Sequence, residues 1–212
     1  SNMMIIGKSG SGKSYATKTL LGNLAADNTK IFILDPENEY DILTEKVKGK
    51  MMDVGSSKSG TFNPFHIMTT LEADEGKTDD SYSLHLQFLE EFFRIILDGL
   101  NSDAFELLNS IVTEVYAKKG IDKDTVIKDL KPQDFPIFDD LLALVREKIP
   151  KEVDPYKKQN YQTIETYVEK FGTGGRNSNL WNGPQCIETK ENFITFSFLS
   201  LLSNRNSLIA AA

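Results

Sequence analysis

Two short apolar runs near the start of the chain predict strands of a parallel sheet. Residues 3–6 and 31–34 are continuously apolar, and residues 14–26 between them place apolar side chains at helical spacing. Continuous apolar runs are typical of parallel strands that are covered on both faces. A strand, a helix and a strand in this order predict a βαβ unit with a right-handed crossover.

The middle of the chain has a helical pattern. From Tyr82 to Phe171 we expect helices throughout, because apolar residues recur at the spacing of one helix face. The apolar faces lie within residues 86–97, 105–115, 141–149 and 161–171. A glycine-rich turn at 172–175 ends this stretch. Residues 193–198 then alternate in a way that predicts a returning strand.

A glycine-rich loop joins the first predicted strand to the first predicted helix. Residues 7–14 read G-K-S-G-S-G-K-S and match the motif G-x-x-x-x-G-K-[ST] without a mismatch. Glycines let the backbone curl so that successive N–H groups point at phosphate oxygens. The first turn of the helix adds unpaired N–H groups and the positive end of its dipole. We therefore predict that this loop binds the phosphates of ATP together with Mg²⁺.

The residues of the loop have separate expected roles. Lys13 supplies a positive charge to the β- and γ-phosphates, and the Ser14 hydroxyl is a ligand of Mg²⁺. The predicted nucleotide-binding residues are Gly10, Ser11, Gly12, Lys13, Ser14 and Tyr15.

The loop and the apolar pattern together predict the fold class. We expect an α/β P-loop core, with a partial parallel sheet, that carries an all-helical insertion. The predicted domains are an α/β half at 1–70, the helical insertion at 71–171, and a return to the α/β core at 172–212.

Hydrolysis of ATP needs an acidic residue at the end of a neighbouring strand. No run of four apolar residues is followed by Asp-Glu. Asp35 comes closest, because it follows the run 31–34 at the carboxyl end of a predicted strand, where ligands of α/β sheets bind. Asp35 and Glu37 are thus catalytic candidates beside Lys13. The alternative is a turn fixed by Pro36, with solvated acids.

Composition and charge narrow the function classes. The net charge of −7 argues against a surface built mainly to neutralise nucleic-acid phosphates. The single cysteine, Cys186, excludes an intramolecular disulfide and fits a reducing compartment. His66 and His85 lack the spacing of metal ligands, so we expect them to be structural. No apolar stretch approaches the roughly 20 residues that cross a bilayer.

Two further motifs make the pattern more specific. Residues 35–40 read D-P-E-N-E-Y, and residues 63–65 read N-P-F. Together with the first strand and the glycine-rich loop, they resemble the large conjugation and type IV secretion ATPases of the TraC/ConE type, in the HerA–FtsK group of P-loop motors. In that family a helical segment, a glycine-rich turn and a strand come next, and residues 172–198 look like the last two. The resemblance covers nearly the whole chain.

This resemblance implies a cytoplasmic motor, docked on the inner face of a membrane channel, that powers substrate transfer or pilus assembly by ATP hydrolysis. It implies other channel proteins as partners, a homo-oligomeric parent protein and an arginine finger from an adjacent subunit; direct DNA contact stays open. The family has a second acidic motif beyond the strand equivalent to 193–198, and this sequence stops before it. We therefore expect a motor-domain fragment that binds nucleotide and lacks the full hydrolytic site.

Two other interpretations stay open. Small-molecule P-loop kinases also begin with such a loop, but they close a lid of several arginines on the phosphates. The four arginines of this chain are scattered, at positions 94, 146, 176 and 205. The third interpretation is a nucleotide-binding docking fragment without turnover. In all three we expect residues 63–65 to form a structural turn packed by its aromatic neighbours.

Overall fold

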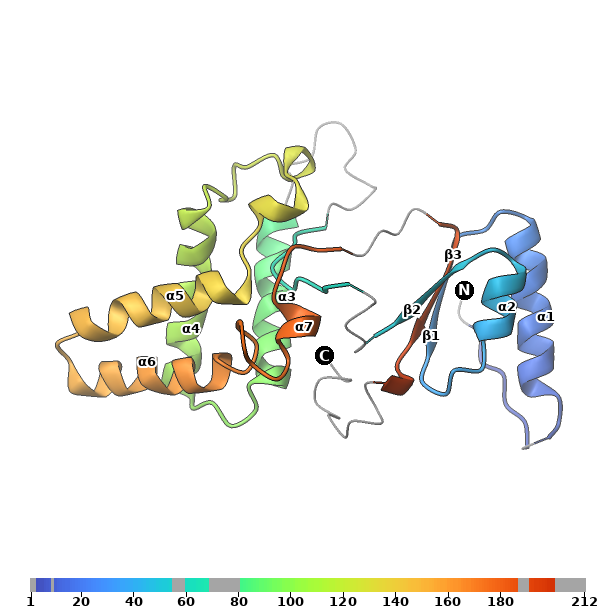
Figure 1. The fold of residues 1–212 in the computed structure, drawn as a ribbon, viewed down its shortest axis with the longest axis horizontal. Coiled ribbons are helices and arrows are strands. Elements are labelled where there is room, and N and C mark those ends of the chain that lie inside the picture. The colour runs from blue at the N-terminus through green and yellow to red at the C-terminus, as the bar shows by residue number, and fades with distance from the viewer. Residues whose placement is uncertain (1–2, 9, 55–59, 69–80, 187–190, 201–212) are drawn as a thin grey trace. The chain divides into compact units, whose positions relative to one another are not determined.

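A computed structural model describes residues 3–8, 10–54, 60–68, 81–186 and 191–200 (Figure 1). These residues fall into two compact units. The sheet unit contains the described residues up to 54 and those from 191 to 200, and the helical unit contains those from 60 to 186. The domain limits 1–70, 71–171 and 172–212 stay predictions.

The sheet unit is built on three parallel strands, β1 (Ile31–Asp35), β2 (Lys50–Asp53) and β3 (Phe193–Ser197). Their order is β1-β3-β2, so the last strand pairs between the two early ones. The strands end in register, because Ser197 is paired with Asp35 on one side and with Asp53 on the other. The predicted α/β class with a partial parallel sheet is confirmed, as are the strands at 31–34 and 193–198.

Two helices pack against the sheet of this unit. They are α1 (Lys13–Ala26), which confirms the helix predicted at 14–26, and α2 (Asp41–Lys46), which the apolar pattern did not indicate. Leu21 and Ala25 of α1 and Leu43 of α2 pack on the buried strand residues. The hydroxyl of Thr44 in α2 lies 2.6 Å from that of Thr195 in β3, a buried hydrogen bond that ties the helix to the central strand.

The strand predicted at residues 3–6 is wrong. These residues have no regular structure, and Ile6 is 85% exposed. A strand is held by hydrogen bonds to a neighbour, and in the described sheet neither edge strand pairs with them. An apolar run indicates that its side chains favour burial, but it does not indicate which strand they would pair with. The first βαβ unit is therefore absent from the described residues.

The prediction that both faces of the second strand are covered is also wrong. Ile31 and Ile33 are buried, whereas Phe32 is 51% and Leu34 is 70% exposed. Phe32 stacks on Phe196 of β3, with ring centroids 6.4 Å apart. The helices of the sheet unit thus cover alternate side chains of β1, as expected for a strand with one covered face.

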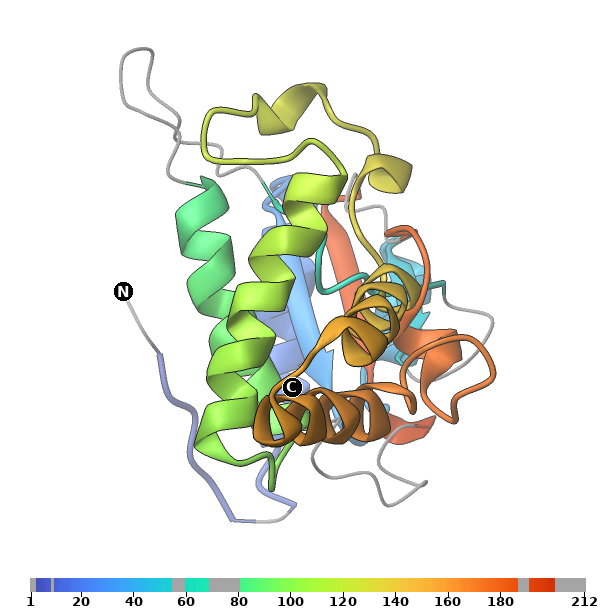
Figure 2. The same ribbon diagram turned by 90° about the vertical axis from the view of Figure 1, so that its left-hand side faces the viewer.

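The helical unit contains five α-helices in the described part of the chain, and α3 and α4 run side by side (Figures 1 and 2). They are α3 (Ser81–Ile96), α4 (Ser102–Lys118), α5 (Phe138–Lys148), α6 (Pro155–Val168) and α7 (Ser178–Trp181). Helices α4, α5 and α6 pack against one another. The Asn101 side chain caps α4 by accepting the Ala104 amide at 2.9 Å.

Helix does not extend throughout 82–171 as predicted. Residues 119–137 form turns that include two short 3-10 helices, Ile127–Asp129 and Pro132–Asp134. Gly120 ends α4 with a φ of 75°, in the left-handed region that stops a helix. Pro132 and Pro136 then remove N–H donors that a helix would need.

The N-P-F turn lies in the core of the helical unit. The Asn63 side chain donates to the Pro136 carbonyl at 2.8 Å and accepts the Phe65 amide at 3.1 Å. Phe65 is 0% exposed, and the Tyr116 hydroxyl donates to its carbonyl at 2.6 Å. The prediction that residues 63–65 form a structural turn packed by aromatic residues is confirmed.

Candidate functional site

The glycine-rich loop has the backbone conformations that its glycines predict. Gly10 and Gly12 have φ angles of 78° and 84°, in the left-handed region that glycine adopts without strain. Gly7 lies against Ser11, and a Cβ there would lie 2.5 Å from the Ser11 hydroxyl oxygen, so a larger residue would require the serine side chain to rotate. The Ser11 amide donates to the Lys8 carbonyl at 3.1 Å and closes a turn within the loop. The chain therefore reverses sharply just before α1.

The start of α1 presents unpaired backbone donors. The Ala16 amide donates to the Gly12 carbonyl at 2.9 Å, and Gly12 supplies no side-chain cap. Among the described residues, the amides of Lys13, Ser14 and Tyr15 have no backbone acceptor. Helix N-termini of this kind attract anions through their N–H groups and the helix dipole. Because Lys13 is exposed and Ser14 half-exposed, both side chains can reach a ligand bound there.

The loop lies at the end of the sheet unit where the parallel strands finish. Helix α1 is joined to β1 by residues 27–30 alone, so the two elements run in opposite directions and the N-terminus of α1 lies toward the carboxyl end of β1. Figure 1 shows this loop and the turn after β1 at the same, lower end of the unit. Ligands of α/β folds bind at this edge.

Asp35 stands at that edge as the anchor of a turn. The residue is 1% exposed, and its carboxylate accepts two backbone hydrogen bonds, from the Glu39 amide at 3.0 Å and the Tyr40 amide at 2.9 Å. Asn38 turns the chain with a φ of 57°, in the left-handed region that asparagine tolerates. The D-P-E-N-E-Y motif is thus a compact turn held from within by its first residue.

The other acids of the motif have different surroundings. Glu37 and Glu39 are exposed, and Tyr40 is half-buried against the core of the sheet unit. Burial raises the pKa of Tyr40, and the nearby carboxylates of Glu39 and Asp35 raise it further. Lys18 of α1 places its ammonium 5.4 Å from the Tyr40 ring centroid, a cation–π contact between helix and motif. The catalytic roles of Lys13, Asp35 and Glu37 stay predictions.

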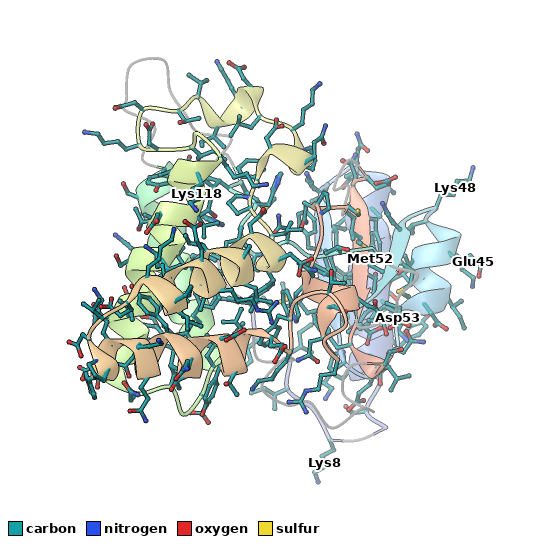
Figure 3. All side chains as sticks on the ribbon, turned by 60° about the vertical axis from the view of Figure 1, so that its left-hand side comes forward. Lys8, Glu45, Lys48, Met52, Asp53 and Lys118 are labelled. Atoms are coloured by element: carbon teal, nitrogen blue, oxygen red, sulfur yellow. The ribbon has the colours of Figure 1, made fainter. Side chains whose placement is uncertain are left out.

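Sequence reasoning missed one acid at the same edge, Asp53 at the end of β2 (Figure 3). Its Oδ2 accepts from the Ser200 hydroxyl at 2.7 Å, and its buried Oδ1 has no hydrogen-bond partner in the described part of the chain. Asp35 and Asp53 are two strands apart, which at the usual strand spacing is about 10 Å. The only sequence signal was the short apolar pair Met51-Met52 before the acid. No group of three metal-ligating side chains occurs within the described residues.

Comparisons with known proteins bear on the whole chain. The family model described as the central domain of helicase HerA matches residues 2–195. The structure of VirB4 of Thermoanaerobacter pseudethanolicus matches with a TM-score of 0.79 and 25% sequence identity, over 95% of this chain and 50% of that chain. The chain thus spans about half the length of that VirB4 chain. No curated protein sequence matches it.

Two findings concern the class of protein to which the chain belongs. Across the residues that the structure describes, no helix has both the length and the apolar character needed to span a membrane. The HerA family model covers nearly the whole sequence, and the VirB4 match supports the same P-loop fold. The protein therefore belongs to the HerA central-domain family.

Proposed function

We propose that this chain is the nucleotide-binding part of an ATPase motor subunit that works in type IV secretion or conjugation. The observation that carries the proposal is the open N-terminus of α1, preceded by left-handed Gly10 and Gly12 and flanked by Lys13 and Ser14. Membership of the HerA family and the likeness to VirB4 support a motor rather than another P-loop class.

The site residues suit ATP and Mg²⁺ in chemistry and placement. Lys13 would contact the β- and γ-phosphates, and the Ser14 hydroxyl would be a ligand of Mg²⁺. The backbone from Gly10 to Tyr15 would contribute N–H groups to the phosphates, because these groups lie at the positive end of α1. Asp35 and Asp53, at the ends of the two strands that flank β3, would place negative charge on the metal side of the site.

The same proposal includes the setting of the parent protein. We infer a homo-oligomer whose adjacent subunit supplies an arginine finger, with channel proteins of the secretion system as partners on the cytoplasmic side of the membrane. ATP hydrolysis by the parent protein would power substrate transfer or pilus assembly. In this proposal the chain itself binds nucleotide and turns it over slowly. The reason is that no run of four apolar residues in its sequence is followed by the Asp-Glu pair of a hydrolytic site.

A small-molecule kinase is the second candidate, and it would need arginines that can close on the phosphates. Arg94 pairs with Glu90 at 2.6 Å, and Arg146 pairs with Glu165 at 2.6 Å. Both arginines lie on helices of the helical unit and are held by these carboxylates, which suits a structural role better than a phosphate lid. Phosphate release measured with and without small hydroxyl acceptors separates the classes, since acceptor-dependent transfer is expected only of a kinase.

Replacing Lys13 by alanine is expected to weaken ATP–Mg²⁺ binding at least tenfold, a loss of about 1.4 kcal/mol or more. The ammonium is the one side-chain charge that the loop brings to the phosphates from the helix N-terminus. Isothermal titration calorimetry with a non-hydrolysable ATP analogue measures the effect. Lys8→Ala is the matched control, because Lys8 is an exposed lysine of the same loop that points away from the rest of the unit (Figure 3). Native-like affinity of Lys13→Ala would show that the loop is not the site.

A further inference from the structure

The helical unit contains a cavity that has no part in the proposed nucleotide site. Its volume is about 400 Å³, in the range of pockets that hold small organic ligands. The walls come from the segment around the N-P-F turn, from α3 and from α7, all within the helical unit. Its largest wall residues are aromatic: Phe62, Phe88, Phe92 and Trp181. Among the described residues, no Lys, Arg, Asp or Glu lines it, so the described walls suit an uncharged ligand better than a nucleotide.

Polar atoms without partners gather on the walls of this cavity. Within the described residues, four buried side-chain nitrogen or oxygen atoms lack a hydrogen bond, and three belong to His66, His85 and Trp181, which all line it. Folded proteins satisfy nearly all buried polar atoms, because an unpaired one keeps the cost of leaving water and gains nothing. Three such atoms around one cavity therefore mark it as a place where a bound molecule, water or ligand, would find hydrogen-bond partners.

The hydrogen-bonding chemistry of two of these atoms follows from their surroundings. Against the larger lowering by burial, the Pro64 backbone carbonyl raises the pKa of His85, so this carbonyl favours a proton on the imidazole nitrogen that faces it. The unpaired nitrogen of His85 is Nε2, which in a neutral ring is an acceptor. Burial lowers the pKa of His85 to about 4, so the ring is neutral near pH 7. Trp181 Nε1 can only donate.

The cavity is open to a ligand at an apolar rim. Met68, Leu84 and Phe88 line it and are 67%, 58% and 49% exposed. At the inner side, Trp181 is buried, with its ring centroid 5.2 Å from that of Phe92. A planar ring that enters past the rim would meet aromatic surface on several sides, an arrangement that favours aromatic over aliphatic ligands.

We propose that this cavity binds an uncharged aromatic group that carries one hydroxyl, that is, a phenol. The hydroxyl donates to His85 and accepts from Trp181, and the ring lies among the aromatic walls. A free phenolic molecule and the tyrosine side chain of a peptide share this chemistry. The proposal does not depend on nucleotide binding, because the cavity and the glycine-rich loop belong to different units.

Fluorescence of Trp181 reports directly on the cavity, because it is the only tryptophan of the chain. Titration of the whole chain with p-cresol, excited where the phenol does not absorb, is expected to give a saturable change. Toluene, which lacks only the hydroxyl, is expected to bind about tenfold more weakly, because it leaves the polar atoms unpaired. N-acetyl-tyrosinamide distinguishes a free phenolic ligand from a peptide tyrosine. It binds as well as p-cresol only if the cavity admits a tyrosine together with its backbone.

Two variants test the assignment of the atoms. His85→Phe keeps an aromatic ring but removes the acceptor, so p-cresol affinity should fall about tenfold, to that of toluene, while toluene affinity is unchanged. Leu84→Glu places a charge at the exposed rim and should weaken both ligands at least tenfold. Its control is Gln87→Glu, the same charge at an exposed position of α3 that does not line the cavity. Lys13→Ala should bind p-cresol like the native chain, even if the nucleotide proposal fails.

Two results would overturn the proposal. One is a p-cresol titration without saturation, as expected if water alone fills the cavity. The other is equal affinity of the native chain for p-cresol and toluene, which would leave the hydroxyl without a role. The second comparison needs no variant, so it decides the question even if His85→Phe does not fold.

Discussion

Replacing Phe65 by alanine is expected to lower the free energy of unfolding of the helical unit by about 3–5 kcal/mol, the usual cost of removing a buried phenylalanine. The Phe65 ring is fully buried, and its centroid lies 5.2 Å from that of Phe138 and 6.0 Å from that of Phe93. These neighbours come from α5 and α3, so one side chain fills the space between two helices. The cavity left by alanine would remain lined by rigid rings that cannot collapse into it.

Urea denaturation followed by Trp181 fluorescence measures this effect, because Trp181 lies in the helical unit and reports on its unfolding. Phe88→Ala is the matched control. Phe88 is 49% exposed, so its loss should cost about 1 kcal/mol or less. A Phe65→Ala variant that is destabilised no more than Phe88→Ala would contradict the assignment of the N-P-F turn to the core. Nucleotide affinity is expected to stay unchanged, since the turn belongs to the helical unit.

The strands of the sheet show what an apolar pattern can and cannot predict. Residues 31–34 are predictable as a strand from a continuous apolar run bounded by polar residues, and residues 193–198 from their alternation. Their order was not predictable, because β3 enters between β1 and β2 from more than a hundred residues downstream. Pairing depends on which edge offers free N–H and C=O groups in the folded unit, and single-strand patterns carry no such information.

The candidate site also has some features that the sequence predicts and others that only the structure shows. The turn before α1 and the start of the helix, predicted at 14 and observed at Lys13, are local properties of the sequence, whereas the nucleotide-binding roles of the loop residues stay predictions. Asp53 was missed because its importance is non-local. Only the register of β2 with β3 brings it to the edge that Asp35 occupies. The buried anchoring of Asp35 also needed the structure, since the sequence left a solvated acid equally open.

Replacing Asp35 by alanine is expected to destabilise the turn after β1 by about 3 kcal/mol. The carboxylate accepts hydrogen bonds from two backbone amides, and such charge-assisted bonds contribute about 1.5–3 kcal/mol each where they are sheltered from water. Alanine would leave the amides of Glu39 and Tyr40 without an acceptor. Because Tyr40 and α2 pack on the core of the sheet unit, loosening this turn should loosen the whole segment from 35 to 46.

Amide hydrogen exchange at Glu39 and Tyr40 tests this directly, because an opening that costs about 3 kcal/mol less speeds protected exchange by roughly a hundredfold. Asp35→Asn retains one carbonyl oxygen but loses the charge, so its exchange should lie between the native and alanine values. Glu37→Ala is the matched control, since Glu37 is an exposed acid of the same turn and should leave both amides protected. If Asp35→Ala kept native protection and lost only nucleotide affinity, the residue would act on the bound nucleotide instead of holding the turn. If both fall together, the turn that Asp35 anchors is what keeps this edge of the sheet in the shape that the nucleotide site requires.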